Sequence, residues 1–391
     1  MLRRCWSSHS NFQLQLCTYW SQMSVKHYSV SNYQAPEWAK DILKKPEKRV
    51  KLAVLPTPIH KWRLDGLPQD VELFIKRDDM TGSTLSGNKV RKLEFILGDA
   101  LSRGCKAVIT CGSIQSNHCR ATAVAARELG LDSYLLLRNK SPILPCFDNL
   151  GNLPSMLCGS QIYFIPKNSK YETTIKPKQE QLAREIEEKT GNPVCCIPVG
   201  GSNSIGVFGY IEAWKEMEHQ NVCTDFDDVV IACGSGGSIA GLAIGNYLTG
   251  QKIKLHAVSV CDDKYFFHEH VNQMLNELGI SGAQSEDLVD IIDGYKGEGY
   301  GLTTKQDHEF LHNIASTTGI LCDPVYTGKA VKGMITELNN TPGRFKGSRV
   351  LYIHTGGVFG LFDSTINSKL EQKYSNGNMF SWFNDSPEKI A

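Results

Sequence analysis

The chain has 391 residues, with 42 lysines and arginines against 41 aspartates and glutamates, and a formal net charge of +1. This length suits about two domains with cores of their own. The balanced charge gives no electrostatic support for a nucleic-acid partner. Because no apolar run approaches the ~18 residues of a membrane-spanning helix, we also expect no membrane span.

The N-terminal segment has the composition of an organellar presequence. It carries Arg3, Arg4 and Lys26 among many Ser, Gln, Tyr and Trp residues, and its first acidic residue is Glu37. Cationic, serine-rich and acid-poor segments are typical of transit peptides. We therefore assign residues 1–32 to a transit peptide or a disordered tail, and expect a mitochondrial location, with plastid or cytosol as alternatives.

Beyond this segment, short apolar runs alternate with stretches of helical period. The expected strands are Val71–Ile75, Ala107–Thr110, Ser133–Leu137, Gln161–Ile165, Asp228–Ala232, Leu255–Val260 and Val350–Ile353. The expected helices are Lys89–Leu101, Ala121–Leu129, Thr173–Lys189, Ile239–Leu248 and Lys305–Thr317. This alternation predicts parallel sheets covered by helices on both faces.

Lys89 follows a Gly-Asn turn at the start of an amphipathic helix, within the segment Ser86–Glu94. A lysine held in this way can form a Schiff base with a carbonyl cofactor, provided that its amine is neutral when it attacks. The alternative is an ordinary solvated lysine at a helix start. The glycine-rich loops later in the chain favour the chemical interpretation.

The loop Gly112–His118 follows an expected strand and leads into a helix. Its hydroxyl, amide and backbone donors suit a substrate carboxylate. It could equally be a capped helix start, with Ser116 or Asn117 as the N-cap residue.

The loop Cys233–Gly241 also joins a strand to a helix, and its small residues allow backbone N–H groups to approach an anion. We predict a phosphate site, with tight strand–helix packing as the alternative. The loop also opens G-x-G, and Asp262 or Asp263 could bind a ribose, as in nicotinamide-dependent oxidoreductases. Because Ile239 occupies the third glycine position, this dinucleotide fingerprint is partial and weak.

The thirteen cysteines are scattered along the chain. Their one adjacent pair is Cys195-Cys196, and there is no C-x-x-C pair of the kind that binds zinc. We expect reduced thiols that act as small buried hydrophobes, and no metal site.

Together these motifs resemble fold type II pyridoxal-phosphate enzymes, and among them the 1-aminocyclopropane-1-carboxylate deaminase / D-cysteine desulfhydrase family, from about Leu55 to Asp363. The motifs are Lys-Arg-Asp-Asp at 76–79, Gly-Asn-Lys-x-Arg-Lys-Leu-Glu at 87–94, Gln-Ser-Asn at 115–117, Asp-Pro-Val-Tyr at 323–326 and Gly-Gly at 356–357. The resemblance implies an α/β fold of two open, twisted, mostly parallel sheets flanked by helices. It also implies a large domain from residues 33–89 and 202–391, a small domain from residues 90–201, and a homodimer.

The resemblance also assigns the site residues and pyridoxal 5′-phosphate as the cofactor. The implied catalytic residues are Lys89, Ser116, Tyr300 and Tyr326, with Lys89 as Schiff-base lysine and proton shuttle. The implied cofactor-binding residues are Lys89, Asn117, Ser235, Gly236, Gly237, Ser238, Thr327 and Thr355. The implied substrate-binding residues are Gln115, Ser116, Asn117 and His118.

Thr327 and Thr355 stand where the cyclopropane deaminases carry glutamate and leucine, and are similar to the hydroxyl pair of the desulfhydrase branch. A carboxylate beside the pyridine nitrogen strengthens the cofactor as an electron sink. Ring opening needs that help, whereas expulsion of a thiolate, whose thiol pKa is ~8.5, needs less. We therefore expect β-elimination of D-cysteine to pyruvate, hydrogen sulfide and ammonia.

Two alternatives stay open at this point. One is a 1-aminocyclopropane-1-carboxylate deaminase that gives 2-oxobutyrate and ammonia, and the more distant one is a non-catalytic pyridoxal-phosphate carrier. The preference for the D isomer comes from the resemblance alone.

Overall fold

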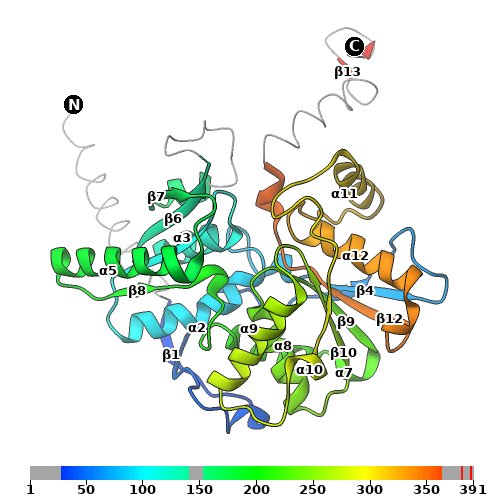
Figure 1. Ribbon diagram of the computed structural model, residues 1–391, viewed down its shortest axis with the longest axis horizontal. Helices are drawn as coiled ribbons and strands as arrows, with labels where there is room; N and C mark the ends of the chain where they lie inside the picture. The colour runs from blue at the N-terminus through cyan, green and yellow to red at the C-terminus, as the bar shows by residue number, and fades with distance from the viewer. Residues whose placement is uncertain (1–27, 141–152, 363–379, 382–387, 390–391) are drawn as a thin grey trace, which may run out of the picture.

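Two parallel sheets lie side by side in the computed structural model, which describes residues 28–140, 153–362, 380–381 and 388–389 (Figure 1). The larger sheet has the strand order β11 (Asp290–Ile292), β10 (Lys254–Ser259), β9 (Asp228–Cys233), β12 (Arg349–Ile353), β4 (Glu72–Lys76) and β3 (Ile59–Lys61). The smaller sheet has the order β7 (Gln161–Pro166), β6 (Asp132–Asn139), β5 (Ala107–Ser113) and β8 (Val194–Cys196). All strand pairs in both sheets are parallel except β3–β4. The predicted α/β class with two mostly parallel sheets is confirmed.

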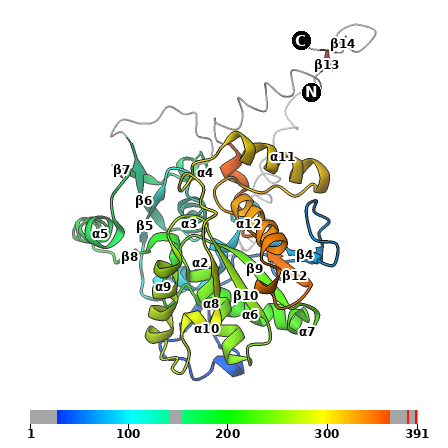
Figure 2. The same ribbon diagram turned by 45° about the vertical axis from the view of Figure 1, so that its right-hand side comes forward.

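The larger sheet is covered on both faces (Figure 2). One face packs against α6 (Phe208–His219), α8 (Gly237–Leu248) and α9 (Lys264–Glu277), and the other against α11 (Lys305–Thr318) and α12 (Thr327–Asn340). In β9, Val229 and Ile231 contact the first set of helices, while Val230 and Ala232 contact the second. Each buried valine or isoleucine among them contributes about 1.5–3 kcal/mol of transfer free energy. Burial on both faces explains why these strands read as continuous apolar runs.

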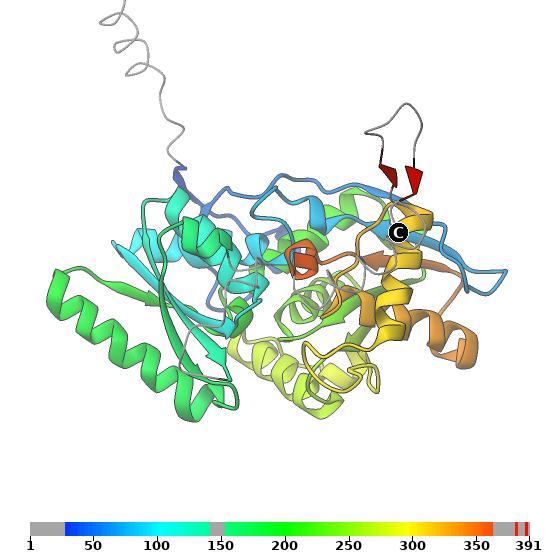
Figure 3. The same ribbon diagram turned by 90° about the horizontal axis from the view of Figure 1, so that it is seen from above.

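The smaller sheet is sandwiched in the same way. Its faces pack against α2 (Asn88–Ser102) and α3 (Asn117–Glu128) on one side and against α5 (Lys176–Thr190) on the other, with α5 at the outer edge of the molecule (Figure 3). Helix α2 also contacts α6 of the larger half. The helix that carries Lys89 is therefore shared between the two sheets. The domain boundaries at residues 89 and 201 stay a prediction.

Several shorter helices and strands also lie in the described chain. They are β2 (Lys48–Val50), α4 (Leu153–Leu157), α7 (Val222–Asp225), α10 (Ser285–Leu288), β13 (Phe380–Ser381) and β14 (Glu388–Lys389). No helix in the described ranges has the length and apolar character that a bilayer crossing requires.

The fold begins before residue 33. Strand β1 (Val30–Asn32) pairs antiparallel with β2. The Tyr33 ring then packs edge-on against Phe95 and Phe208, at centroid distances of 4.8 and 5.9 Å. The segment 1–32 assigned from composition thus overlaps the fold at β1, while residues 1–27 lie outside the described part.

Ten cysteines lie in the described ranges and all are free. Burial raises the pKa of every one of these thiols, to about 12 for Cys111, Cys119 and Cys233. Among the same residues, no three His, Cys, Asp or Glu side chains are grouped closely enough to hold a metal ion.

A buried cluster of charges joins β4, α2 and α6. Arg91 donates to the two carboxylate oxygens of Asp78 at 3.0 and 2.8 Å and to those of Glu216 at 2.9 and 3.1 Å. Lys76 donates to Glu216 at 2.6 Å, and the Tyr210 hydroxyl donates to Asp78 at 2.8 Å. Burial alone would raise the pKa of Asp78, but Arg91 and Lys76 outweigh it and hold that pKa below its ordinary value. The Lys-Arg-Asp-Asp and Lys-x-Arg motifs therefore meet in one network.

We expect Arg91→Met to lower the free energy of unfolding by about 3–5 kcal/mol, because it leaves two buried carboxylates without their shared partner. Urea unfolding of the cofactor-loaded protein measures this loss. Arg103→Met is the matched control, since Arg103 lies at the end of the same helix with its side chain half exposed in an ion pair with Asp99. It should change stability by no more than about 0.5 kcal/mol. Equal losses in the two variants would contradict the assigned role of the network.

Candidate active site

The start of α2 lies directly against the end of β12. Gly87 has φ +104°, and a Cβ there would lie 2.7 Å from the carbonyl oxygen of Thr355. Gly356 has φ +93°, and its own Cβ would lie 2.6 Å from the Cα of Gly87. The backbone N–H of Asn88 donates to the Thr355 carbonyl at 3.1 Å. Only glycine at both positions allows this approach, which fixes where Lys89 enters the site.

The Lys89 amine has no hydrogen-bond or ion-pair partner within the described part of the chain. Burial lowers the pKa of Lys89 to about 8, and the thiols of Cys233 and Cys261 only partly oppose the shift. A Cβ on Gly200 would lie 3.4 Å from Lys89 Nζ and 2.4 Å from Ser235 Oγ, so the amine faces the loop after β9. With that pKa, about a tenth of the amine is neutral at pH 7, far more than for an exposed lysine.

The loop after β9 forms the N-terminus of α8. Gly236 adopts φ +78° just before the helix begins, and Ser238 Oγ accepts a hydrogen bond from Asn88 Nδ2 at 3.0 Å. Behind the loop, Ser202 Oγ donates to the Ser235 carbonyl at 2.7 Å, and His270 Nε2 lies 2.8 Å from the same hydroxyl. Free backbone N–H groups at such a helix start bind anions.

Lys92 is a site residue that the sequence analysis missed. It is 1% exposed, its nearest partner is the Gly200 carbonyl at 3.4 Å, and a Cβ on Gly237 would lie 3.0 Å from its Nζ. Burial and the neighbouring Lys89 lower its pKa well below the ordinary value. A buried amine without an acidic partner, aimed at a helix N-terminus, fits a doubly charged phosphate. The spacing of three residues from Lys89, one helical turn, could have identified it.

In the loop after β5, Gln115 and Asn117 are partly exposed, whereas Ser116 and His118 are buried. Ser116 is the N-cap of α3, because its Oγ accepts from the Cys119 N–H at 3.1 Å. His118 is 3% exposed, with Nε2 2.8 Å from Thr110 Oγ1, and burial lowers its pKa well below the ordinary value. A neutral ring so placed offers no positive charge to a carboxylate.

Tyr300 and Tyr326 form a pair although 26 residues separate them. Their hydroxyl oxygens are 2.5 Å apart, and their rings meet edge to face at a centroid distance of 5.8 Å. Burial raises the pKa of Tyr326 well above its ordinary value. Tyr300 is 39% exposed as a residue, but desolvation of its hydroxyl still raises its pKa, and hydrogen bonds with Tyr326 and Ser113 partly oppose that shift. Both hydroxyls are therefore protonated at neutral pH, and since one donates to the other, the pair has one proton left for a further hydrogen bond.

The structure distinguishes between the two threonines. Thr327 is fully buried, and its hydroxyl donates to the Asp323 carboxylate and accepts from the Asp323 N–H, both at 2.7 Å. Thr355, at 9% exposed, has a side-chain hydroxyl with no partner in the described ranges. Of the pair, Thr355 is the one whose hydroxyl is available to a ligand.

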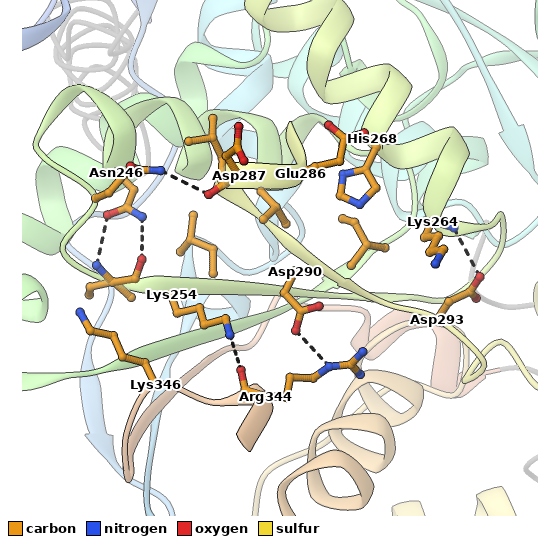
Figure 4. Close-up of a pocket in the computed structure, with 16 residues that line it drawn as sticks. Asn246, Lys254, Lys264, His268, Glu286, Asp287, Asp290, Asp293, Arg344 and Lys346 are labelled. Atoms are coloured by element: carbon orange, nitrogen blue, oxygen red, sulfur yellow. Dashed lines mark hydrogen bonds and ion pairs between the residues drawn. The ribbon is translucent and has the colours of Figure 1, made fainter. Parts of the chain in front are cut away.

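A hollow of about 880 Å³ lies elsewhere, at the β11 edge of the larger sheet (Figure 4). Several of its charged groups already have partners. Lys254 donates to the Arg344 carbonyl at 2.6 Å, and Arg344 pairs with Asp290 at 3.2 Å. None of the candidate site residues lines it.

A partly desolvated lysine follows a glycine turn, and a glycine-rich helix N-terminus faces it. Together with the two parallel sheets, this arrangement is that of a pyridoxal-phosphate dependent enzyme of fold type II. The profile of the family described as "Pyridoxal-phosphate dependent enzyme" matches residues 50–356. The chain belongs to this family, and within it to the 1-aminocyclopropane-1-carboxylate deaminase / D-cysteine desulfhydrase group.

The relatives support that placement. A bifunctional D-cysteine desulfhydrase/1-aminocyclopropane-1-carboxylate deaminase, mitochondrial, of Arabidopsis thaliana is 47% identical over 338 residues, which cover 85% of this chain and 83% of that protein. A putative 1-aminocyclopropane-1-carboxylate deaminase of Thermotoga maritima is 38% identical over 316 residues, or 80% and 97% of the two chains. The crystal structure of an ACC deaminase homologue superimposes with a TM-score of 0.72 at 32% identity, over 87% of this chain and 99% of that one.

The cofactor of the family is pyridoxal phosphate, and the residues present fit it. Lys89 offers a free amine of lowered pKa, and Lys92 offers a second buried amine beside the α8 N-terminus, where a phosphate would favour its protonated form. The backbone and hydroxyls of Ser235 to Ser238 face the same space. When bound, the cofactor would be held by Lys89 at its aldehyde and by this loop at its phosphate.

We expect the apoprotein to bind pyridoxal phosphate faster as the pH rises through about 8, because the lowered pKa makes the Lys89 amine neutral above that value. Growth of the visible absorbance band after mixing measures the rate. Lys89→Ala should form no band, while a variant of the exposed Lys106, Lys106→Ala, should behave as wild type. A midpoint near the ordinary lysine value of ~10.4 would contradict the assignment.

Proposed function

We propose that the protein catalyses β-elimination of D-cysteine, in which D-cysteine and water give pyruvate, hydrogen sulfide and ammonia. The observation that carries this proposal is the unpartnered Thr355 hydroxyl at the end of β12, beside the start of the Lys89 helix. A hydroxyl there supports elimination of a good leaving group without a carboxylate to enforce protonation of the pyridine. The name of the Arabidopsis thaliana relative, with its desulfhydrase activity, agrees.

Lys89 is the proposed base at Cα. Bound pyridoxal phosphate supplies an electron sink that makes the Cα proton of an amino acid acidic. The lowered pKa of Lys89 allows its Nζ to accept that proton near neutral pH. Gln115, Ser116 and Asn117, which lie at the N-terminus of α3, are the proposed donors to the substrate carboxylate.

The tyrosine pair is proposed to stabilise the negative charge that develops on the departing sulfur. Because both pKa values are raised, Tyr300 and Tyr326 keep their protons, and the hydroxyl that accepts within the pair can donate its own proton in a hydrogen bond to a developing thiolate. The Cβ–S bond breaks with its electron pair on sulfur, which leaves as hydrosulfide. Hydrolysis of the remaining enamine then gives pyruvate and ammonia.

A second candidate is the deaminase reaction on 1-aminocyclopropane-1-carboxylate, because the Arabidopsis thaliana relative is named for both activities. A carrier without catalysis is disfavoured, since a phosphate-binding protein has no need of the aligned Tyr300–Tyr326 pair. The mitochondrial location is supported by the N-terminal composition and by the name of that relative. The homodimer stays a prediction.

The purified enzyme should release sulfide and pyruvate from D-cysteine, with little from L-cysteine and little 2-oxobutyrate from the cyclopropane amino acid. Separate incubations with the three substrates, assayed for sulfide, pyruvate and 2-oxobutyrate, test this. Dominant 2-oxobutyrate would show that the second candidate is the main activity.

Thr327→Glu combined with Thr355→Leu should raise the ratio of ring opening to desulfhydration, by about tenfold or more if pyridine protonation decides between the reactions. The ratio of 2-oxobutyrate to sulfide formed by the holoenzyme measures it. Thr355→Ser keeps the hydroxyl and is the control, so its ratio should stay at the wild-type value. An unchanged ratio in the double variant would refute the argument from the pyridine nitrogen.

A further inference from the structure

We propose that Lys329 is a positioning residue that holds the loop Gly294–Gly301, and with it Tyr300, in register with Tyr326. The inference rests on the proposed function in so far as that function assigns a role to Tyr300. The tie itself is visible in the structure without any assumption about substrate.

Lys329 reaches from α12 into the backbone of the loop. Its side chain is almost fully buried, and its Nζ donates to the carbonyl oxygens of Lys296 at 2.7 Å and Gly299 at 2.8 Å. Gly299 immediately precedes Tyr300. The same helix begins next to Tyr326. One helix turn thus fixes both members of the tyrosine pair.

The loop has little else to hold it. Four of its residues, Gly294, Gly297, Gly299 and Gly301, have φ values of +98°, +61°, +143° and +71°. A Cβ at Gly294, Gly297 or Gly301 would meet nothing within 4 Å. At its base, the Tyr295 hydroxyl donates to Glu337 at 2.7 Å. Between that anchor and the Tyr300 hydroxyl, the two bonds from Lys329 are the side-chain ties seen in the described structure.

Position 329 is energetically unfavourable for a lysine unless the lysine binds the loop. It lies in the first turn of α12, where the helix dipole opposes a cation, and burial lowers its pKa although Asp307 and Asp323 favour the charge. The ammonium forms no ion pair among the described residues, and both its hydrogen bonds go to loop carbonyls. These bonds to backbone carbonyls offset the cost of burying the charge.

The test compares Lys329→Met with Lys332→Met in the holoenzyme without substrate. Lys332 lies one turn further along α12, half exposed, and pairs with Asp307 at 2.9 Å instead of with the loop. Hydrogen exchange of the amides at 294–302 should become about tenfold faster in Lys329→Met and stay unchanged in Lys332→Met. Lys329→Arg, which can still donate to two carbonyls, should restore most of the protection. Equal exchange in wild type and Lys329→Met would overturn the proposal.

Turnover supplies a second, independent readout. Per cofactor-loaded protein, Lys329→Met should lower kcat about tenfold, and adding it to Tyr300→Phe should cause little further loss, because both changes act on one hydroxyl. Losses that multiply in the double variant would show that Lys329 does not act through Tyr300. If wild-type protein does not turn over D-cysteine, the proposed function fails, while the exchange experiment still decides whether Lys329 holds the loop.

Discussion

The position of Lys89 depends on the buried contact between Arg91 and the carboxylates of Asp78 and Glu216. Breaking a buried ion pair is far more costly than its net contribution to stability, so such a contact restricts a helix to one position rather than strengthening it. In α2, Arg91 and Glu94 lie on one face, and Lys89 and Lys92 on another. The first face is clamped, since Glu94 also binds Arg49 and two backbone N–H groups. The second face, with Lys89 and Lys92, is directed toward the loop after β9.

In the candidate site, desolvation rather than acidic neighbours is the main cause of the pKa shifts of the lysine and the two tyrosines. The amine of Lys89 loses its proton easily, and the phenols of Tyr300 and Tyr326 keep theirs. An amine that is partly neutral near pH 7 and a protonated hydroxyl suit the proposed elimination, the amine at Cα and the hydroxyl at the leaving group. In the proposed function, the free hydroxyl of Thr355 stands where a carboxylate would otherwise favour protonation of the cofactor's pyridine nitrogen.

The sequence predicted what depends on periodicity and missed what depends on packing. All seven expected strands form, because strands buried on both faces give unmistakable apolar runs. Strands of three residues, such as β8 and β11, carry too few residues to show a period. Motif reading placed Thr327 and His118 in the site, but it could not show that the Thr327 hydroxyl is bound to Asp323 or that the His118 ring turns inward. The helical spacing of Lys92 from Lys89 was a signal that the sequence analysis did not use, and the burial that separates Lys92 from a surface lysine is seen only in the structure.

The absence of disulfides among the described cysteines matters for the proposed product, hydrosulfide. Hydrosulfide is a nucleophile and a reductant, and it attacks disulfides. Within the described ranges there is no cross-link for it to cleave, and burial keeps the thiols, including Cys233 and Cys261 near the site, in their protonated form. Under the proposed function, the described part of the chain therefore offers the product no disulfide to reduce, and its protonated thiols are slow to form one.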